Sequence, residues 1–96
     1  MNMTTVERIR AELTSFTPVA LDIHDDSHLH AGHAGSASGG GHFRLHIVSQ
    51  KFVGLGTLAR HRMIYAALGP LMKQEIHALS IDAHTPDELG QNSDPA

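Results

Sequence analysis

The sequence of 96 residues contains no cysteine. The chain therefore forms no disulfide bond and supplies no thiolate to a metal ion or cluster. Chemistry that needs soft sulfur ligands would require thiolates from a partner molecule. Nine histidines are present instead, and five of them fall within residues 24–42.

Aromatic residues are scarce, with three Phe, one Tyr and no Trp. The core of so short a chain leaves little room for a deep cavity around a large organic cofactor, so we expect a surface site. No segment approaches the roughly 20 apolar residues that span a bilayer. The N-terminus also lacks the apolar run of a signal peptide. These absences predict a soluble, cytoplasmic protein with no membrane contact.

The formal net charge is −3, from 7 basic and 10 acidic residues. This balance argues against strong non-specific binding to nucleic acid, which depends on the neutralisation of phosphates. The distribution is uneven, because residues 51–73 hold four basic residues and no acidic one. Those residues are Lys51, Arg60, Arg62 and Lys73. They predict a local basic surface on a chain that is acidic overall.

Hydrophobic periodicity predicts a single domain over residues 1–96, with a core over about 4–89 and a disordered tail over 90–96. Thr4 and Glu7 have the spacing of a capping box at the start of a helix. The expected elements are a helix over 4–16, strands over 19–24 and 42–49, a helix from about Thr57, a short helix from Pro70 through Ile76, a strand over 77–84 and a helical turn after Thr85. Three strands with helices on one face predict an α+β two-layer domain.

Within the strand over 42–49, Phe43, Leu45 and Ile47 alternate toward one face, which we assign to the core. His42, Arg44 and His46 then lie on the opposite face and need no function. His24 and His84 are predicted to be surface residues for the same reason.

The connection over residues 25–41 is the least regular part of the sequence. Its seventeen residues exceed the usual length of a structureless loop, so it is either functional or disordered. His28, His30 and His33 lie within it. From the residues alone, a metal site, a nucleic-acid loop and a flexible connector that picks up zinc or nickel all stay open.

Several unusual motifs occur together in one order. They are DDSHLHAGHAG, then HFRLHIVSQKFVGLGTLARHRMIYAAL, then IHALSIDAHTPDEL. With this order and spacing, from about Val6 to Leu89, the chain resembles the BolA family. The strongest pieces are Phe52-x-Gly54 followed by Arg60-His61-Arg62, and Ile76-His77-Ala78-Leu79 followed by Thr85-Pro86.

The resemblance implies an αββαβ core similar to a class II KH domain. It also implies a non-enzymatic partner of a monothiol glutaredoxin. In such a complex a [2Fe–2S] cluster is held by a glutaredoxin cysteine, a glutathione thiolate and ligands from the BolA-like chain. The cluster is expected only in the complex, because this chain supplies no sulfur ligand. The role would be cluster transfer or iron and redox sensing.

By the same resemblance, His77 matches the family's ligand at the start of the last strand. Strand parity alone places it on the face of Leu79 and Ile81, where it would cap the edge of the core. The second ligand comes from the long connection, where His30 is the favoured residue and His33 and His28 are less favoured.

Transcriptional regulation through DNA binding, which the family also implies, is the alternative. Arg60, Arg62 and Lys73 would then contact phosphates, with His61 on the packed side of the helix. The stretch before this helix, Gly54-Leu55-Gly56, lacks the spacing of the G-x-x-G loop by which KH domains bind RNA. No Ser/His/Asp or paired-carboxylate arrangement indicates an enzyme. The sequence leaves open whether the free chain forms a weak homodimer.

Overall fold

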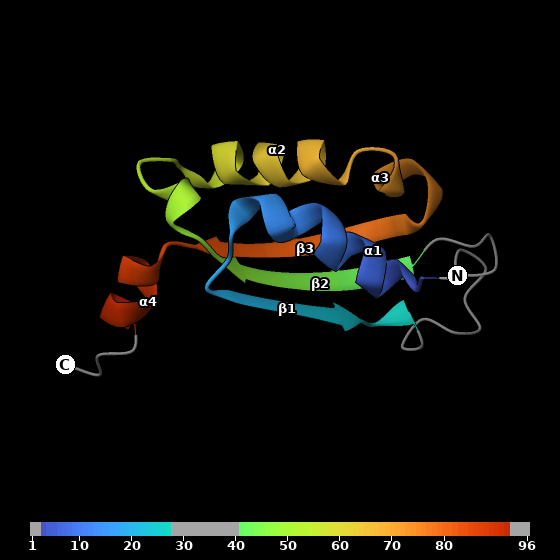
Figure 1. Ribbon diagram of the computed structural model, residues 1–96, viewed down its shortest axis with the longest axis horizontal. Helices are drawn as coiled ribbons and strands as arrows, with labels where there is room; N and C mark the ends of the chain where they lie inside the picture. The colour runs from blue at the N-terminus through green and yellow to red at the C-terminus, as the bar shows by residue number, and fades with distance from the viewer. Residues whose placement is uncertain (1–2, 28–40, 93–96) are drawn as a thin grey trace.

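A three-stranded sheet carries the main helices of this protein on one face (Figure 1). The computed structural model describes residues 3–27 and 41–92. The elements are α1 Thr5–Glu12, η1 Leu13–Phe16, β1 Ala20–Asp25, β2 Gly41–Val48, η4 Gln50–Phe52, α2 Thr57–Leu68, α3 Leu71–Gln74, β3 Ile76–His84 and α4 Pro86–Asn92. The predicted α+β two-layer fold is confirmed.

The strands lie in the order β1-β2-β3. β1 runs antiparallel to β2, whereas β3 runs parallel to it. Parallel pairing needs a crossover connection, and α2 and α3 supply it. The sheet is therefore mixed, and its central strand β2 contacts a neighbour along both edges. In the part of the chain that the structure describes, no helix combines the length and apolar character needed to cross a membrane.

The first helix begins and ends as its sequence predicts. The Thr4 side chain accepts a hydrogen bond from the Glu7 amide, and the Glu7 carboxylate accepts one from the Thr4 amide. This capping box satisfies backbone donors that the helix itself leaves unpaired. The chain leaves the helical layer at Thr17, which has a φ of 41° and precedes Pro18. The predicted helix over 4–16 is α1 continued by the 3₁₀ turn η1.

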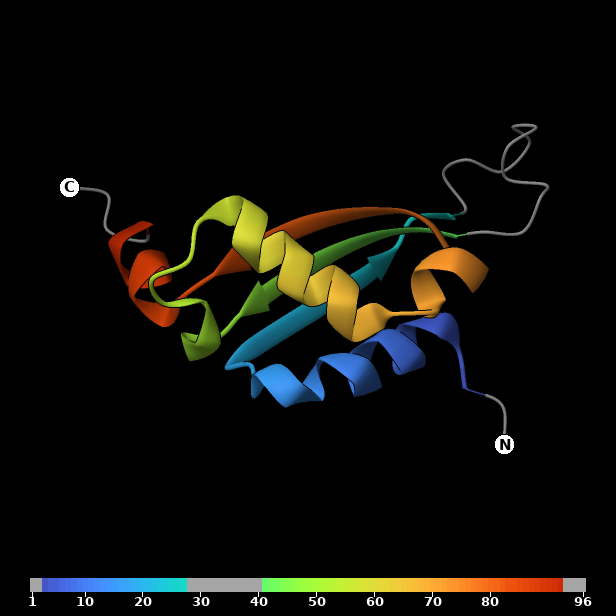
Figure 2. The same cartoon turned by 90° about the horizontal axis from the view of Figure 1, so that it is seen from above.

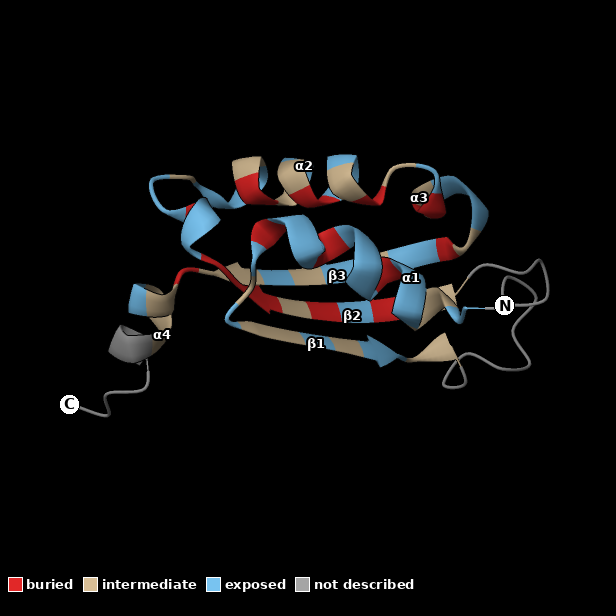
Figure 3. Cartoon of the chain, in the orientation of Figure 1, coloured by how far each residue is buried: buried red, intermediate tan, exposed pale blue. Residues whose placement is uncertain are grey.

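The core lies between the helices and the predicted face of β2. Phe43, Leu45 and Ile47 are almost completely buried there. Across from them, α1 and α2 lie next to each other over the sheet (Figure 2). The buried segments of both helices are on the sides that face the sheet (Figure 3). The residues that complete the core are Ile9, Leu13, Phe16, Phe52, Ile64, Leu68, Leu71 and Ile76. Burial of each large apolar side chain contributes about 1.5–3 kcal/mol.

Two boundaries near the C-terminal end differ from the prediction. The short helix that was expected from Pro70 through Ile76 ends at Gln74. Ile76 is instead the first residue of β3, because the Glu75 carbonyl accepts the Gly41 amide at 3.0 Å and joins the chain to the sheet. The tail was expected from residue 90, yet α4 continues to Asn92; residues 93–96 lie outside the described part.

Candidate histidine sites on the open face of the sheet

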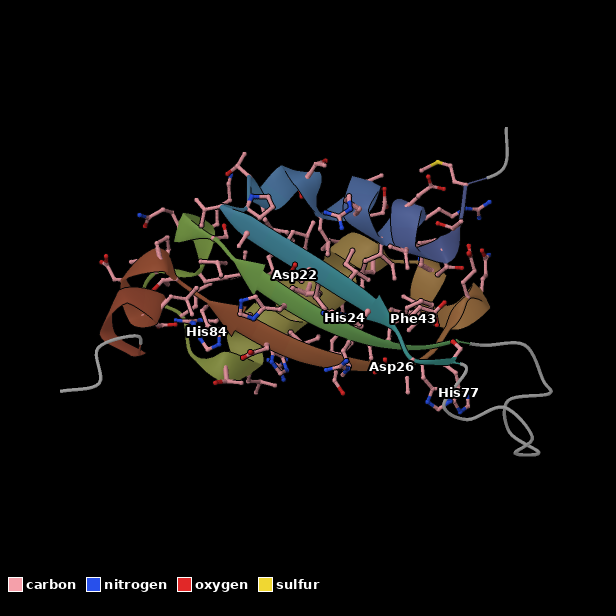
Figure 4. The ribbon with its side chains drawn as sticks, turned by 90° about the horizontal axis from the view of Figure 1, so that it is seen from below. Asp22, His24, Asp26, Phe43, His77 and His84 are labelled. Carbon is pink, nitrogen blue, oxygen red and sulfur yellow. The ribbon has the colours of Figure 1, made fainter. Side chains whose placement is uncertain are left out.

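The sheet face opposite α1 and α2, here called the open face, is rich in charged and imidazole side chains (Figure 4). It includes Asp22 and His24 on β1 and Arg44 and His46 on β2. The alternation along β2 confirms that its even-numbered residues 42–46 face away from the core residues Phe43, Leu45 and Ile47. Side chains from three strands can therefore meet on this face without burial in the core.

His77 lies at one end of the open face and is exposed. Its ring centroid is 5.2 Å from that of His42, with an interplanar angle of 43°. The prediction from parity that it shares the face of Leu79 and Ile81 is wrong. A register shift at Gly41/His42 places Gly41 opposite Ile76 and His42 opposite Ala78, so His77 falls on the bulge. A bulge interrupts the two-residue period, and it turns His77 outward while Ile76 stays buried.

The ends of the long connection are held beside this histidine pair. The Ser27 hydroxyl accepts the His42 amide at 3.0 Å, and the Asp26 amide donates to the His42 carbonyl at 2.8 Å. Gly41 is joined to Glu75, two residues before His77. His28, His30 and His33 lie outside the described residues. The connection nevertheless leaves and rejoins the sheet next to His42 and His77.

Gly41 permits a close backbone approach at this point. A Cβ atom on residue 41 would lie 2.3 Å from Cε2 of Phe43, far inside van der Waals contact. The Phe43 ring is buried and cannot swing into solvent. Glycine therefore lets the bulged end of β2 pack over the ring, and this arrangement positions His42 and His77.

A second histidine pair lies at the other end of β3, where Figure 4 shows His84 far from His77. The rings of His46 and His84 have centroids 5.7 Å apart. Asp82 lies between them: one carboxylate oxygen is 3.2 Å from His46 Nδ1, and the other is 2.5 Å from His84 Nε2. The parallel register places Asp82 opposite His46, and the two-residue period places His84 on the same face as Asp82.

The electrostatics of this cluster stabilise a charged carboxylate. Burial by itself raises the pKa of the Asp82 carboxyl. Hydrogen bonds from the His46 and His84 rings outweigh that effect and hold the pKa of Asp82 below its usual value. From the sequence alone, His46 and His84 are predicted to be surface residues without a function. The pattern of a single strand does not show that β2 pairs with β3.

Arg60 does not lie free on the surface of α2, as the alternative DNA-binding prediction requires. Its side chain is only 11 % exposed. It donates to the carbonyls of Leu55 and Ala83, and two of its nitrogens donate to the two carboxylate oxygens of Glu88 at 2.7 and 2.6 Å. This bidentate pair ties the start of α2 to β3 and α4. Arg60 therefore has a structural role, and its largely buried guanidinium lacks the exposure that the predicted phosphate contact assumed.

Glu88 has two hydrogen-bonding partners, Arg60 and Thr85. Besides Arg60 it accepts the Thr85 amide at 3.1 Å, while the Thr85 hydroxyl accepts the Glu88 amide at 3.2 Å. The Arg60 hydrogen bond, followed by the Thr85 amide, lowers the pKa of Glu88 to about 2. Thr85-x-x-Glu88 has the capping-box spacing, so the sequence carries a signal for this role that we did not use.

The remaining basic residues of the alternative site are exposed. Arg62 projects from α2 and Lys73 from α3, and His61 is half-buried. α2 starts at the end of the sheet near α4, whereas α3 lies at the opposite end (Figure 1). The basic stretch over residues 51–73 is therefore distributed along the helical layer.

Comparison with known proteins agrees with this fold. The family model described as BolA-like protein matches residues 13–88. The chain belongs to the BolA-like family. Solved structures agree: the BolA domain of SufE1 from Arabidopsis thaliana superposes with a TM-score of 0.77 at 42% identity, over 92% of this chain and 99% of that one.

Relatives of this BolA-like chain have several names. SufE-like protein 1 of Arabidopsis thaliana, described as chloroplastic/mitochondrial, is 48% identical over 85% of this chain and 24% of its own length. BolA-like protein 1 of Pongo abelii is 42% identical over 88% of this chain and 61% of its own. The chain thus spans less than two thirds of either relative. The DNA-binding transcriptional regulator BolA of Escherichia coli K12 is 41% identical, over 82% of this chain and 73% of its own length.

Some motifs that carry the BolA-like resemblance have structural roles. Phe52 is fully buried, and Gly54 adopts a φ of +82°, which favours glycine. Arg60 is the anchor described above and lies 5.9 Å from the centroid of the Phe52 ring. His77, in contrast, is exposed at the edge of the sheet, and no core role accounts for its position.

Proposed function

We propose that this BolA-like chain binds a monothiol glutaredoxin and shares a bridging [2Fe–2S] cluster with it. The cluster is the cargo of the complex, for transfer to other proteins or for iron and redox sensing. One observation carries the proposal. The bulge turns His77 into solvent beside the point where the histidine-bearing connection leaves the sheet. The role is non-enzymatic.

The donor set of the chain fits a shared cluster better than one held alone. Without cysteine, the chain offers imidazoles, and the thiolates would come from the glutaredoxin and glutathione. Replacing thiolates by histidine raises the reduction potential of a [2Fe–2S] centre. His77 stands on a paired strand, which suits a preorganised ligand. The second imidazole would be His30, with His33 and His28 as less favoured choices.

Co-expression with a monothiol glutaredoxin in the presence of glutathione tests the proposal. We expect a coloured complex that contains iron and acid-labile sulfide, whereas the chain purified alone is colourless. His77→Ala should abolish the visible spectrum and the bound iron. His84→Ala is the matched control, because it removes an imidazole from the same strand at its other end, and it should keep both. A colourless complex without iron would refute the proposal.

The loop ligand is tested in the same complex with single variants. His30→Ala should lower the iron content, and His33→Ala and His28→Ala should lower it less. If His30→Ala leaves both spectrum and iron unchanged while His33→Ala removes them, the cluster proposal stands and the ligand assignment moves to His33.

DNA-binding regulation is the second candidate, favoured by the name of the Escherichia coli relative, a DNA-binding transcriptional regulator. Arg62 and Lys73 are the exposed residues on which it would depend. Binding to duplex DNA should then weaken steeply with salt, and the double variant Arg62→Ala/Lys73→Ala should weaken it and reduce the salt dependence. Arg10→Ala, a change on α1, is the control. Salt-insensitive binding would count against this role.

A cytoplasmic location stays a prediction. One plant relative is named as chloroplastic/mitochondrial. Fluorescence microscopy of the tagged chain in its own cell type would decide the compartment.

A further inference from the structure

We propose that His46, Asp82 and His84 bind a divalent transition-metal ion such as Zn²⁺ on the open face of the sheet. One ligand atom from each of the three side chains lies within 4.8 Å of the other two. Two imidazoles and one carboxylate are a common ligand set for zinc. This site is separate from His77, which lies at the opposite end of β3 (Figure 4).

Metal binding would require only small movements of these three side chains. Asp82 oxygens are now 3.2 Å from His46 Nδ1 and 2.5 Å from His84 Nε2. Zinc–ligand bonds of about 2.0–2.2 Å in tetrahedral geometry separate ligand atoms by roughly 3.3 Å. Small side-chain rotations would therefore open space for the ion. The three residues stand on two paired strands, so the backbone positions are already held.

The other nitrogen of the His84 ring faces a second carboxylate, that of Glu88. This nitrogen, Nδ1, lies 3.7 Å from a Glu88 carboxylate oxygen, while Nε2 faces Asp82. Glu88 is held in turn by the bidentate Arg60 pair. The 3.7 Å separation is longer than a hydrogen bond, so this carboxylate acts on the ring through its charge alone. Arg60 and Glu88 therefore fix a negative charge beside the proposed site.

The cluster is reachable from solvent on both sides of Asp82. One hollow is lined by His24, Arg44, His46 and Asp82, among others. A second is lined by Arg60, Asp82, His84 and Glu88, among others. Three protein ligands with an accessible flank leave a fourth position for water or for a ligand from another molecule.

Zinc titration of the full chain tests the site, provided that the histidines of the long connection are first removed as competitors. The background variant is His28→Gln/His30→Gln/His33→Gln. We expect isothermal titration calorimetry to show one Zn²⁺ per chain in this background. Adding His84→Gln or Asp82→Asn should weaken binding at least about tenfold, since loss of even an outer partner costs 10–100-fold. His77→Gln is the matched control and should leave affinity within about twofold, because it lies outside the ligand set.

A spectroscopic readout distinguishes lost ligands from lost structure. Circular dichroism should show that every variant remains folded. Zinc should shift the ring proton resonances of His46 and His84 and leave those of His24 unchanged. No binding in the background variant, or equal affinity with and without His84, would overturn the proposal. Because the titration uses the chain alone, its failure is independent of the glutaredoxin experiment.

Discussion

Two pairs of histidine rings join β2 and β3 on the same face, and they are built differently. The His42–His77 pair has centroids 5.2 Å apart and lies where the long connection leaves the sheet. The His46–His84 pair has centroids 5.7 Å apart and encloses the carboxylate of Asp82. At the first pair a bulge turns a ring outward. At the second, a regular register brings three ligands together.

The difference shows how one sheet can present imidazole to two kinds of chemistry. A ligand that a partner must reach needs exposure and a nearby connection, which His77 has. A site within the chain needs ligands that hold one another in place, and Asp82 does this for both rings. The second pair also rests on Arg60 and Glu88. Each pair can therefore be disturbed without altering the other.

The largest expected effect on stability comes from Arg60, which holds Glu88 beside the His46–His84 pair. Arg60→Ala removes two carbonyl contacts and the bidentate pair with Glu88. Loss of hydrogen bonds to a charged, buried group should lower the free energy of unfolding by about 2–3 kcal/mol. For a domain of this size the midpoint of thermal unfolding falls by about 10–15 °C. Arg62→Ala, an exposed change on the same helix, is the control and should alter it little. Equal midpoints for both variants would contradict this role of Arg60.

At the first pair, Gly41→Ala should be the most disruptive small change. The new Cβ would collide with the buried Phe43 ring. Such overpacking costs about 1–3 kcal/mol. The amide resonances of His42 and His77 should shift, and those of His46 and His84 should not. Gly56→Ala is the matched control, because no atom beyond its chain neighbours lies within 4 Å of its Cβ position. As the N-cap of α2, Gly56 should lose at most about 1 kcal/mol of capping free energy on this change. If both alanine variants unfold at the same urea concentration, the close approach at Gly41 is not needed.

Acid should weaken the Arg60–Glu88 pair that supports the His46–His84 pair. Folding lowers the pKa of Glu88 from 4.5 to about 2, so its stabilising contribution is complete above pH 4.5 and is lost as the pH falls toward 2. Urea unfolding of the wild type should therefore show a stability loss between pH 5 and pH 2.5. Glu88→Gln should show a smaller loss over that range. An identical pH dependence in the two proteins would exclude the Arg60–Glu88 pair as its source.

The smallest expected effect on stability is that of Asp82→Asn. The Asp82 side chain is 63 % exposed, and exposed ion pairs contribute about 0–1 kcal/mol. Thermal unfolding should shift by only a few degrees, although zinc binding should weaken strongly. A large loss of stability would mean that Asp82 serves folding more than metal binding.

Much of the fold could be predicted from local patterns. The capping box at Thr4 and Glu7, the alternation of Phe43, Leu45 and Ile47 and the break at Gly69-Pro70 all indicate the elements that the structure contains. These signals act over a few residues, where propensity and periodicity dominate. The C-terminal end of α3 was predicted less well, because the pairing of Glu75 with Gly41 decides it.

The candidate sites were less predictable. Parity failed at His77 because a bulge depends on both paired strands, and one strand shows only its own period. The pairing of Arg60 with Glu88 was not predicted, because that carboxylate lies 28 positions away in the sequence. The placement of His28, His30 and His33 is outside the described residues, so the loop ligand stays a prediction.

By itself the sequence determined the composition of any site: without cysteine and with nine histidines, the chain can offer imidazole and carboxylate ligands but no thiolate. It also determined the alternation that separates the core face from the open face. Only the tertiary structure decided which imidazoles meet. The parallel register of β2 and β3 brings His46 to Asp82 and His84, and the bulge at the other end turns His77 outward. Both depend on contacts between residues far apart in the chain, which no local pattern records.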